Sequence, residues 1–176
     1  MDPRESTVIL RPPSLADEGP ALAAQDELRA DDFTFAFLAP DESWSDFVER
    51  AELERQDIGV PPDRVPSTFL MAVVGDDVVG RVSIRHRLND HLRVEGGHIG
   101  YAIRPAFRRR GYATQVLRQS LDIVRGLGIE RALVTCDDDN TASARVIESC
   151  GGVLEDVVVT QKYGPVRRYW IDLTTG

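Results

Sequence analysis

Cysteine is scarce in this chain of 176 residues, where only Cys136 and Cys150 are present. They fall on a predicted strand and at the end of a predicted helix, without the close spacing of metal ligands. A disulfide framework of the kind that stabilises small secreted domains is therefore a poor fit as well. We expect reduced, packed thiols and no metal site.

Long apolar runs and an excess of positive charge are also missing. No segment approaches the roughly twenty apolar residues that cross a bilayer, and the N-terminal Met-Asp-Pro-Arg-Glu is unlike a signal peptide. The net charge of −8 argues against a general nucleic-acid binder, because phosphate contacts need exposed Lys and Arg. We expect a cytoplasmic protein that binds neither membranes nor nucleic acids.

The remaining composition suits one globular domain. Hydrophobic residues make up 42% of the chain, which is enough for a proper core, while 176 residues are too few for two ordinary domains. We therefore predict a single domain over residues 1–176.

The most informative segment, residues 97–114, predicts a strand, a turn and the start of a helix. The β-branched Ile99 and Ile103 favour the strand, and Pro105 ends it because proline cannot donate to the ladder. The basic run that ends at Gly111 supplies positive charge and little bulk where the helix begins, so free backbone N–H groups converge on an anion. A phosphate group is the ligand that this arrangement favours.

Two segments resemble the acetyl-CoA site of a known family. Arg108-Arg-Arg-Gly-Tyr-Ala113 resembles the Arg/Gln-x-x-Gly-x-Gly/Ala pyrophosphate loop of the GNAT superfamily of N-acetyltransferases. Asn140-x-x-Ser143-x-Arg-Val-Ile-Glu-x-x-Gly151 resembles its second acetyl-CoA segment, in the form of the branch that acetylates ribosomal proteins. Gly96-Gly-His-Ile-Gly-Tyr101 and Arg168-Tyr-Trp-Ile171 are similar to a bacterial subgroup known as predicted acetyltransferases. A Gly-x-Gly-x-x-Gly fingerprint and a Gly-Lys-Ser/Thr P-loop are both absent from the sequence, which argues against a dinucleotide or P-loop fold.

The element pattern and the resemblance imply the same fold class, an α/β (mixed α+β) GNAT-like acyl-CoA N-acyltransferase fold. In it, helices flank a central, mostly antiparallel, twisted sheet. The segment after Ser14 predicts a helix with Leu15, Leu22 and Leu28 on one side. The sequence also predicts strands at 7–11, 98–104 and 132–136, a helix at 41–56, a loop at 57–66, a hairpin at 68–88, a helix from 114 to about 126, and closing strands at 153–160 and 168–173.

The resemblance implies acetyl-CoA as co-substrate and direct attack of an amine on its thioester. Arg108 is the main side-chain candidate for the pyrophosphate, whereas Arg109 and Arg110 reach the nucleotide phosphate or face water. Asn140 bonds the pantetheine arm, caps a helix, or does both. The implied co-substrate site comprises Arg108, Arg109, Arg110, Gly111, Tyr112, Ala113, Thr114, Asn140 and Ser143, with Ala102 and Ile103 as backbone donors to the thioester oxygen.

The base and the acid are less clearly marked. His98 is the first candidate base, since related acetyltransferases have an acidic residue at about this place and an imidazole pKa near ~6.5 leaves it neutral. Its alternative role is to satisfy a backbone group, and Glu95 is the second candidate. Ile147 replaces the tyrosine that many relatives use as acid, and Gly152 replaces an aromatic residue common after the helix. Tyr112, Tyr101 or the departing thiolate itself remains as the solution.

The predicted acceptor is a small molecule or a peptide with a primary amine. Seven acidic residues at 41–57, against two arginines, favour a cationic amine if they line the cleft and otherwise form a solvated helix face. Trp170 lies either in a homodimer contact through the closing strands or in the core. We predict an N-acetyltransferase; the alternative is a non-catalytic acyl-CoA-binding or regulatory domain, for which Ile147 is the supporting feature.

Overall fold

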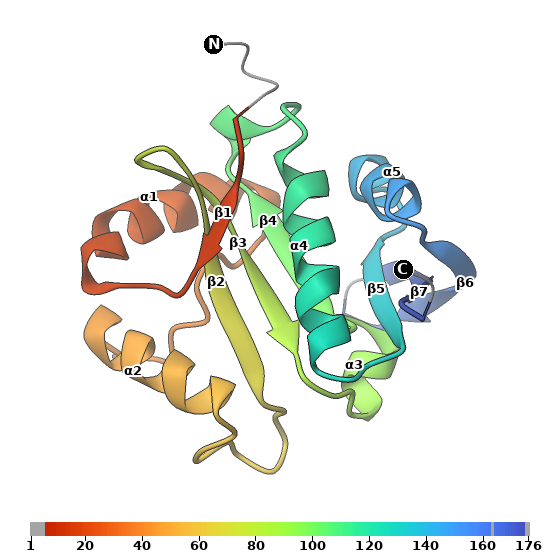
Figure 1. Cartoon of the computed structure of the whole chain (residues 1–176), viewed down its shortest axis with the longest axis horizontal. Coiled ribbons are helices and arrows are strands. Elements are labelled where there is room, and N and C mark those ends of the chain that lie inside the picture. Colours follow the sequence, from red (N-terminus) through yellow and green to blue (C-terminus); the bar gives the residue numbers. More distant parts are fainter. Residues whose placement is uncertain (1–5, 163, 175–176) are drawn as a thin grey trace.

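A seven-stranded sheet forms the centre of the protein (Figure 1). The computed structural model describes residues 6–162 and 164–174. The strands are β1 (Ile9–Arg11), β2 (Ser67–Val74), β3 (Asp77–Arg85), β4 (Ile99–Ile103), β5 (Arg131–Asp137), β6 (Val153–Thr160) and β7 (Gly164–Asp172). The helices are α1 (Glu18–Leu28), α2 (Trp44–Arg55), α3 (Asp90–Val94), α4 (Tyr112–Gly126) and α5 (Thr141–Ser149), with 3-10 turns η1 (Leu15–Asp17), η2 (Arg29–Asp31) and η3 (Pro105–Phe107).

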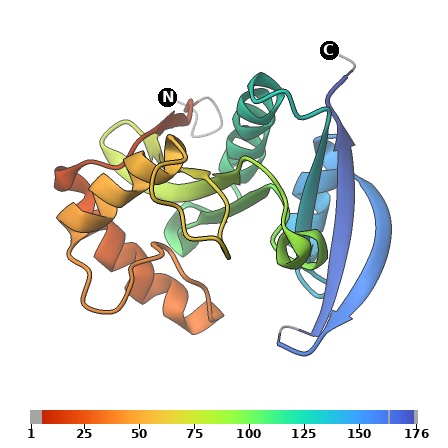
Figure 2. The same ribbon diagram turned by 90° about the horizontal axis from the view of Figure 1, so that it is seen from below.

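The strand order is β1-β2-β3-β4-β5-β7-β6. Each neighbouring pair is antiparallel except β4 and β5, which run parallel. This topology confirms the mixed, mostly antiparallel sheet that the sequence predicts. Helices cover both faces, with α1 and α2 on one side of the β2–β4 half and α4 on the other (Figure 2).

The alternation of side chains along β2 explains the two hydrophobic clusters of the core. Leu70 and Ala72 point into the cluster that includes α4 and α5, whereas Met71 and Val73 point into the cluster that includes α1 and α2. Because both faces are covered, β2 and β3 are apolar along almost their whole length.

The apolar residues of α4 form one buried stripe along most of the helix. Val116, Leu117, Leu121 and Val124 are all buried in the main cluster. Leu127 is 43% exposed, because the helix ends at Gly126 and the chain turns away. The stripe fixes how α4 lies on the sheet, and so fixes the direction in which its first residues point.

The predicted apolar side of α1 is wrong. Leu15 is 66% exposed and Leu22 is 49% exposed, while Ala21, Ala24 and Leu28 are buried. The reason is that residues 15–17 form a 3-10 turn before α1 begins, so that Leu15 is not in phase with the helix. Two small alanines then form the contact and let the helix approach the sheet closely.

The structure differs from the prediction in two further places, a short helix and the start of a strand. The five-residue helix α3, capped by the Asn89 side chain, is too short to show a periodicity in the sequence. β7 begins at Gly164, earlier than predicted. On it Trp170 is half-buried, donates from Nε1 to Glu155 Oε2 and lies under the Arg131 guanidinium, so its ring is not part of either core cluster.

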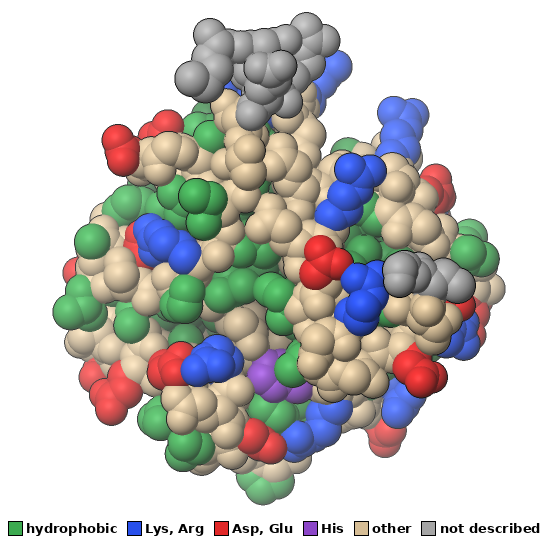
Figure 3. All heavy atoms as spheres, in the orientation of Figure 1, with side chains coloured by type: hydrophobic (Ala, Val, Ile, Leu, Met, Phe, Trp, Pro, Cys, Tyr) green, Lys and Arg blue, Asp and Glu red, His purple; other side chains and the backbone are tan. Residues whose placement is uncertain are grey.

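The surface on the side of α4 is mixed in character. Apolar side chains gather beside α4 near the centre of this face, and charged side chains are scattered around them (Figure 3). In the part of the chain that the structure describes, no helix has the length and the apolar content needed to span a bilayer.

Candidate active site

The sheet opens between its two parallel strands. β4 and β5 share a single register pair, Ile99 with Val134, and beyond it the two strands have no paired residues. The Arg104 N–H donates to Val79 O, which makes Ile103 a non-hydrogen-bonded residue of the β3 ladder. Its own N–H therefore points away from β3, toward the opening. Ala102 belongs to the β3 side, so Ile103 is the better placed of the two predicted backbone donors.

The turn before α4 has the geometry of an anion site. Arg109 (φ 63°) and Gly111 (φ 79°) both have left-handed backbone conformations, and they bring the chain sharply into the helix. No side chain caps the N-terminus of α4, so its first N–H groups are free to bind a ligand. A Cβ at Gly111 would meet nothing within 4 Å, so glycine is needed here for its conformation. The turn fits the pyrophosphate of acetyl-CoA.

The three arginines of this turn have different roles. The guanidinium of Arg108 donates to Asp31 Oδ2 at 2.6 Å and to the carbonyl of Ile103 at 3.1 Å, so it joins the turn to η2 and the end of β4. Arg110 donates to the carbonyl of Ala106. Arg109 has no hydrogen-bond partner among the described residues. Arg109 is thus the side chain most available to a phosphate, in place of Arg108.

The first turn of α4 contains the next predicted site residues. Ala113 and Thr114 are half-buried there. The Tyr112 side chain, by contrast, is only 4% exposed and packs in the main core cluster. A phenol enclosed in this way does not reach a departing thiolate, so Tyr112 is not retained as the acid.

The opposite edge of the opening is formed by α5. Asn140 Oδ1 accepts the N–H of Ser143 at 3.1 Å, which confirms the helix cap, and its amide nitrogen has no partner in the described chain. The Ser143 hydroxyl lies 2.9 Å from the Tyr101 hydroxyl and so joins α5 to β4 across the opening. Burial raises the pKa of Tyr101 to about 12, so the phenol stays protonated.

The two positions that depart from the family pattern, Ile147 and Gly152, lie against each other. Ile147 is completely buried, and a Cβ at Gly152 would lie only 2.5 Å from its Cγ2 atom. The same Cβ would lie 2.8 Å from the backbone oxygen of Ile147, so position 152 requires glycine whatever side chain stands at 147. Of the tyrosines considered as acids, Tyr101 is the one that faces this opening.

The geometry of His98 argues against its role as a base. Its Nδ1 accepts the N–H of Leu133 at 2.9 Å, and the ring is 5% exposed. A neutral imidazole that accepts at Nδ1 has its hydrogen on Nε2, so Nε2 can donate but cannot accept a proton. Burial, together with Arg93 and Arg85, lowers the pKa of His98 to about 4. The alternative role, satisfaction of a backbone group, is the one the structure shows.

Glu95 has the features of a base. Its side chain is 14% exposed, and Oε1 lies 3.6 Å from the exposed His91. Oε2 is buried without a hydrogen-bond partner, the only such side-chain atom in residues 6–162 and 164–174. Asp137 lies close enough for its charge to interact with that of Glu95. Burial raises the pKa of Asp137, and the charges of Asp139 and Glu95 raise it further. A cavity of about 250 Å³ opens at this end of β5.

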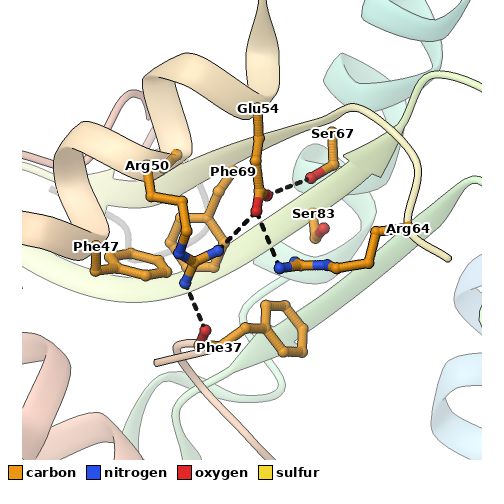
Figure 4. A pocket seen from close by; sticks show the side chains of 9 residues that line it. Phe37, Phe47, Arg50, Glu54, Arg64, Ser67, Phe69 and Ser83 are labelled. Carbon is orange, nitrogen blue, oxygen red and sulfur yellow. Dashed lines mark hydrogen bonds and ion pairs between the residues drawn. The ribbon is translucent and has the colours of Figure 1, made fainter. Parts of the chain in front are cut away.

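Several acidic residues in and around α2 pair with arginines. Glu54 accepts from Arg50 at 2.7 Å and from Arg64 at 3.0 Å (Figure 4). Glu42 also pairs with Arg50. These contacts surround a small cavity of about 30 Å³ lined by Phe37, Phe47, Arg50, Ala51, Glu54, Arg64, Ser67, Phe69 and Ser83. Glu42 and Glu54 are therefore neutralised by arginines, so these two carboxylates do not offer free negative charge to a cationic ligand.

Comparison with known proteins identifies the family of the chain. Residues 7–153 match the acetyltransferase (GNAT) domain family. The chain belongs to this family. Membership confirms the resemblance to the GNAT superfamily, and it makes the protein an acetyltransferase.

Solved structures of similar fold cover almost the whole chain. They include the microcin C7 self-immunity acetyltransferase MccE in complex with acetyl-CoA and AMP, at 19% identity and a TM-score of 0.71, over 97% of this chain and 94% of that one. The putative acetyltransferase yncA from Salmonella typhimurium with acetyl-CoA has 18% identity and a TM-score of 0.65, over 97% and 96%. The Salmonella typhimurium enzyme that modifies the N-terminal serine of L7/L12 has 18% identity and a TM-score of 0.70, over 97% of both chains. No curated protein matches the chain in sequence.

Proposed function

We propose that the protein is an acetyl-CoA-dependent N-acetyltransferase that transfers the acetyl group directly to the primary amine of a small molecule or a peptide. The observation that carries the proposal is the uncapped N-terminus of α4, opened by Gly111 beside the gap between β4 and β5. Similar folds hold acetyl-CoA, and one of them modifies a protein N-terminus.

Different residues around the opening bind different parts of acetyl-CoA. Acetyl-CoA supplies an activated acetyl group. The free N–H groups of α4, with Gly111 and Arg109, bind its pyrophosphate. The amide nitrogen of Asn140 donates to the pantetheine arm, and the Ile103 N–H donates to the thioester oxygen, where negative charge develops during attack.

The acceptor must lose a proton before it attacks. A primary amine with a pKa near ~10.4 is mostly ammonium at neutral pH, so it needs a base or a water chain. Glu95 takes this role, because its buried Oε2 has no hydrogen-bond partner in the described chain, so an ammonium or a bridging water that enters beside it finds a free acceptor. His98 fixes the chain beside it through the bond to Leu133.

The test of this proposal is a thiol-release assay with acetyl-CoA over a panel of amines, combined with calorimetric titration of acetyl-CoA. We expect Glu95→Gln to lower kcat by roughly 10²–10⁴-fold with unchanged acetyl-CoA affinity, as removal of a general base does. Asp137→Asn is the matched control, because that carboxylate lies nearby on β5. A loss of turnover in Asp137→Asn alone would assign the base to Asp137.

The same assay separates the enzyme from a non-catalytic acyl-CoA-binding domain. An enzyme releases thiol at a rate that depends on the amine, whereas a binding domain gives a calorimetric signal with acetyl-CoA and no amine-dependent release. Binding without turnover across the whole panel would favour the second reading.

A further inference from the structure

A half-buried arginine on β3 has an unused hydrogen-bonding edge. Arg85 donates from Nη1 to the carbonyl of Gly96 at 2.9 Å. Its Nε and Nη2 atoms have no hydrogen-bond partner in the described chain. The only fully buried side-chain atom without a partner in that part is Glu95 Oε2, so both of these nitrogens are in reach of solvent. The guanidinium therefore has one edge that is free to bind an anion.

Other arginines of this protein show what that edge binds. Arg55, Arg104 and Arg168 each donate from Nε and Nη2 to the two oxygens of one carboxylate, with the nitrogens 2.6 to 2.9 Å from the oxygens. This is the bidentate geometry in which a guanidinium and a carboxylate fit best. In Arg85 the same edge is empty, and no carboxylate within ion-pair distance appears among its described contacts. Burial, with no compensating negative charge, lowers the pKa of Arg85 to about 10.

On the face of the sheet that carries Arg85, its neighbours on β3 and β4 are a serine and a glycine. Ser83 lies two residues earlier on the same face of β3 and pairs in register with Gly100 of β4. A Cβ at Gly100 would lie 2.9 Å from Nη1 and 3.3 Å from Nη2 of Arg85, so the guanidinium lies directly over this glycine. The Ser83 hydroxyl has no hydrogen-bond partner in the described chain either, and it lines the small cavity of Figure 4. Gly100 thus lies opposite Ser83 and under the Arg85 guanidinium, two donors with unused hydrogen-bonding capacity in the described chain.

We infer that Arg85 and Ser83 bind a carboxylate of the acceptor, so that the substrate is an amine bearing its own carboxylate, as in a free amino acid. This inference rests on the proposed function. Arg85 donates to Gly96, the residue that follows Glu95, so the anchor for the carboxylate adjoins the base for the amine. An amino acid presents these two groups at short separation. The inference replaces the expectation of a purely cationic acceptor.

The experiment compares free amino acids with their carboxamides as acceptors. Each pair has the same amine and side chain and differs only in the negative charge. We expect kcat/KM to be about tenfold to a hundredfold higher for the carboxylate member, the range of one bidentate charged contact. Acetylation of carboxamides at an equal or higher kcat/KM would overturn the inference while leaving the acetyltransferase function intact.

Three variants test whether the preference for carboxylates over carboxamides comes from Arg85. Arg85→Met keeps the apolar stem and removes the charge, and we expect it to raise KM for the carboxylates about tenfold to a hundredfold with little change for the carboxamides. Gly100→Ala keeps the charge but displaces the guanidinium, so it should act in the same direction. Arg87→Met is the matched control, because Arg87 is 57% exposed and lies 3.4 Å from Asp57. Equal losses for both acceptor types in Arg85→Met would show a structural role only and would contradict the inference.

Calorimetry distinguishes failure of the inference from failure of the proposed function. If no amine is acetylated, titration of wild-type protein with free amino acids still measures carboxylate binding. Binding that Arg85→Met abolishes would support the carboxylate site in a non-catalytic protein. Absence of binding in wild-type protein would overturn the inference together with the turnover result.

Discussion

His98 shows how a single backbone contact decides the chemistry of a side chain. In the sequence it is a histidine on a strand near an acetyl-CoA loop, which favours a base. In the fold its accepting nitrogen is occupied by the Leu133 N–H, and the remaining nitrogen is a donor. The sequence could not show this, because Leu133 is far along the chain on another strand. The role passes to Glu95, whose unpartnered oxygen is equally invisible in the sequence.

His98 gives a prediction for stability against pH. The folded protein keeps His98 neutral down to about pH 4, whereas the unfolded chain protonates it near 6.5. Between these values the unfolded state binds more protons, so the free energy of unfolding falls as the pH falls from about 6.5 toward 4. We expect this contribution to be roughly 2–3 kcal/mol and to be fully present above pH 6.5.

Urea unfolding of wild type and His98→Asn at pH 7 and pH 5 measures the effect. The asparagine oxygen can still accept from the Leu133 N–H but does not titrate in this range. The variant should lose the part of the pH dependence that the histidine supplies. The same slope in both proteins would show that His98 protonates in the fold as readily as in the unfolded chain.

Tyr101 gives a prediction for catalysis. Its hydroxyl is protonated at neutral pH and bonds to Ser143 across the opening. We expect Tyr101→Phe to lower kcat about tenfold to a hundredfold through loss of a donor to the departing sulfur, with a small change in acetyl-CoA affinity. Single-turnover kinetics measures this step. Unchanged kcat would mean that the thiolate departs without an acid.

At the scale of elements, α4 and α5 were predictable and the face of α1 was not. The long apolar period of α4 and the Asn140 cap of α5 are local signals that the tertiary structure preserves. In α1 the contact depends on close approach, so Ala21 and Ala24 are buried while Leu22 is left outside. The position of the Arg85 guanidinium over Gly100 depends on the register of β3 against β4, which the sequence leaves open.

The turn before α4 provides the element-scale prediction. At Gly111 the φ of 79° disfavours a side chain, so Gly111→Ala should destabilise the fold by about 1 kcal/mol and weaken acetyl-CoA binding by distorting the N–H groups. Gly126→Ala at the other end of α4 is the matched control, since it has no positive φ and a Cβ there meets nothing within 4 Å. It should be neutral or stabilising. Calorimetry of acetyl-CoA on both variants measures the difference, and equal affinities would remove the pyrophosphate assignment from this turn.

At the scale of the whole molecule, Arg81 joins the helical layer to the sheet. It is 2% exposed and donates to the carbonyls of Thr34, Phe35 and Gly100 at 2.7 to 2.9 Å, while Phe33 and Phe37 lie over its guanidinium. The segment between α1 and α2 is thereby tied to β3 and β4. Burial lowers the pKa of Arg81 to about 9, and the charge is retained at neutral pH.

The Arg81 contacts bear on the predicted single domain over residues 1–176, because they tie the helical layer to the sheet. The possible homodimer is a second prediction, and unfolding experiments address both. Trp44 lies in α2 and Trp170 on β7, so each reports on a different half of the sheet. In a single domain their fluorescence changes coincide during unfolding. A homodimer would add a dependence of the transition on protein concentration.

Arg81→Met tests the whole arrangement when it is made in two backgrounds, Trp44→Phe and Trp170→Phe, so that each protein contains one tryptophan. Methionine fills the space but leaves buried carbonyls without donors, so the free energy of unfolding should fall by about 2–4 kcal/mol. The urea midpoints from the two tryptophans should fall together, with unchanged m-values, because one cooperative unit loses stability as a whole. Arg87→Met, at an exposed site, should stay within about 0.5 kcal/mol of wild type. A lowered midpoint at Trp44 alone would mean that the helical layer unfolds independently of the sheet around β7, and that the chain is not one domain.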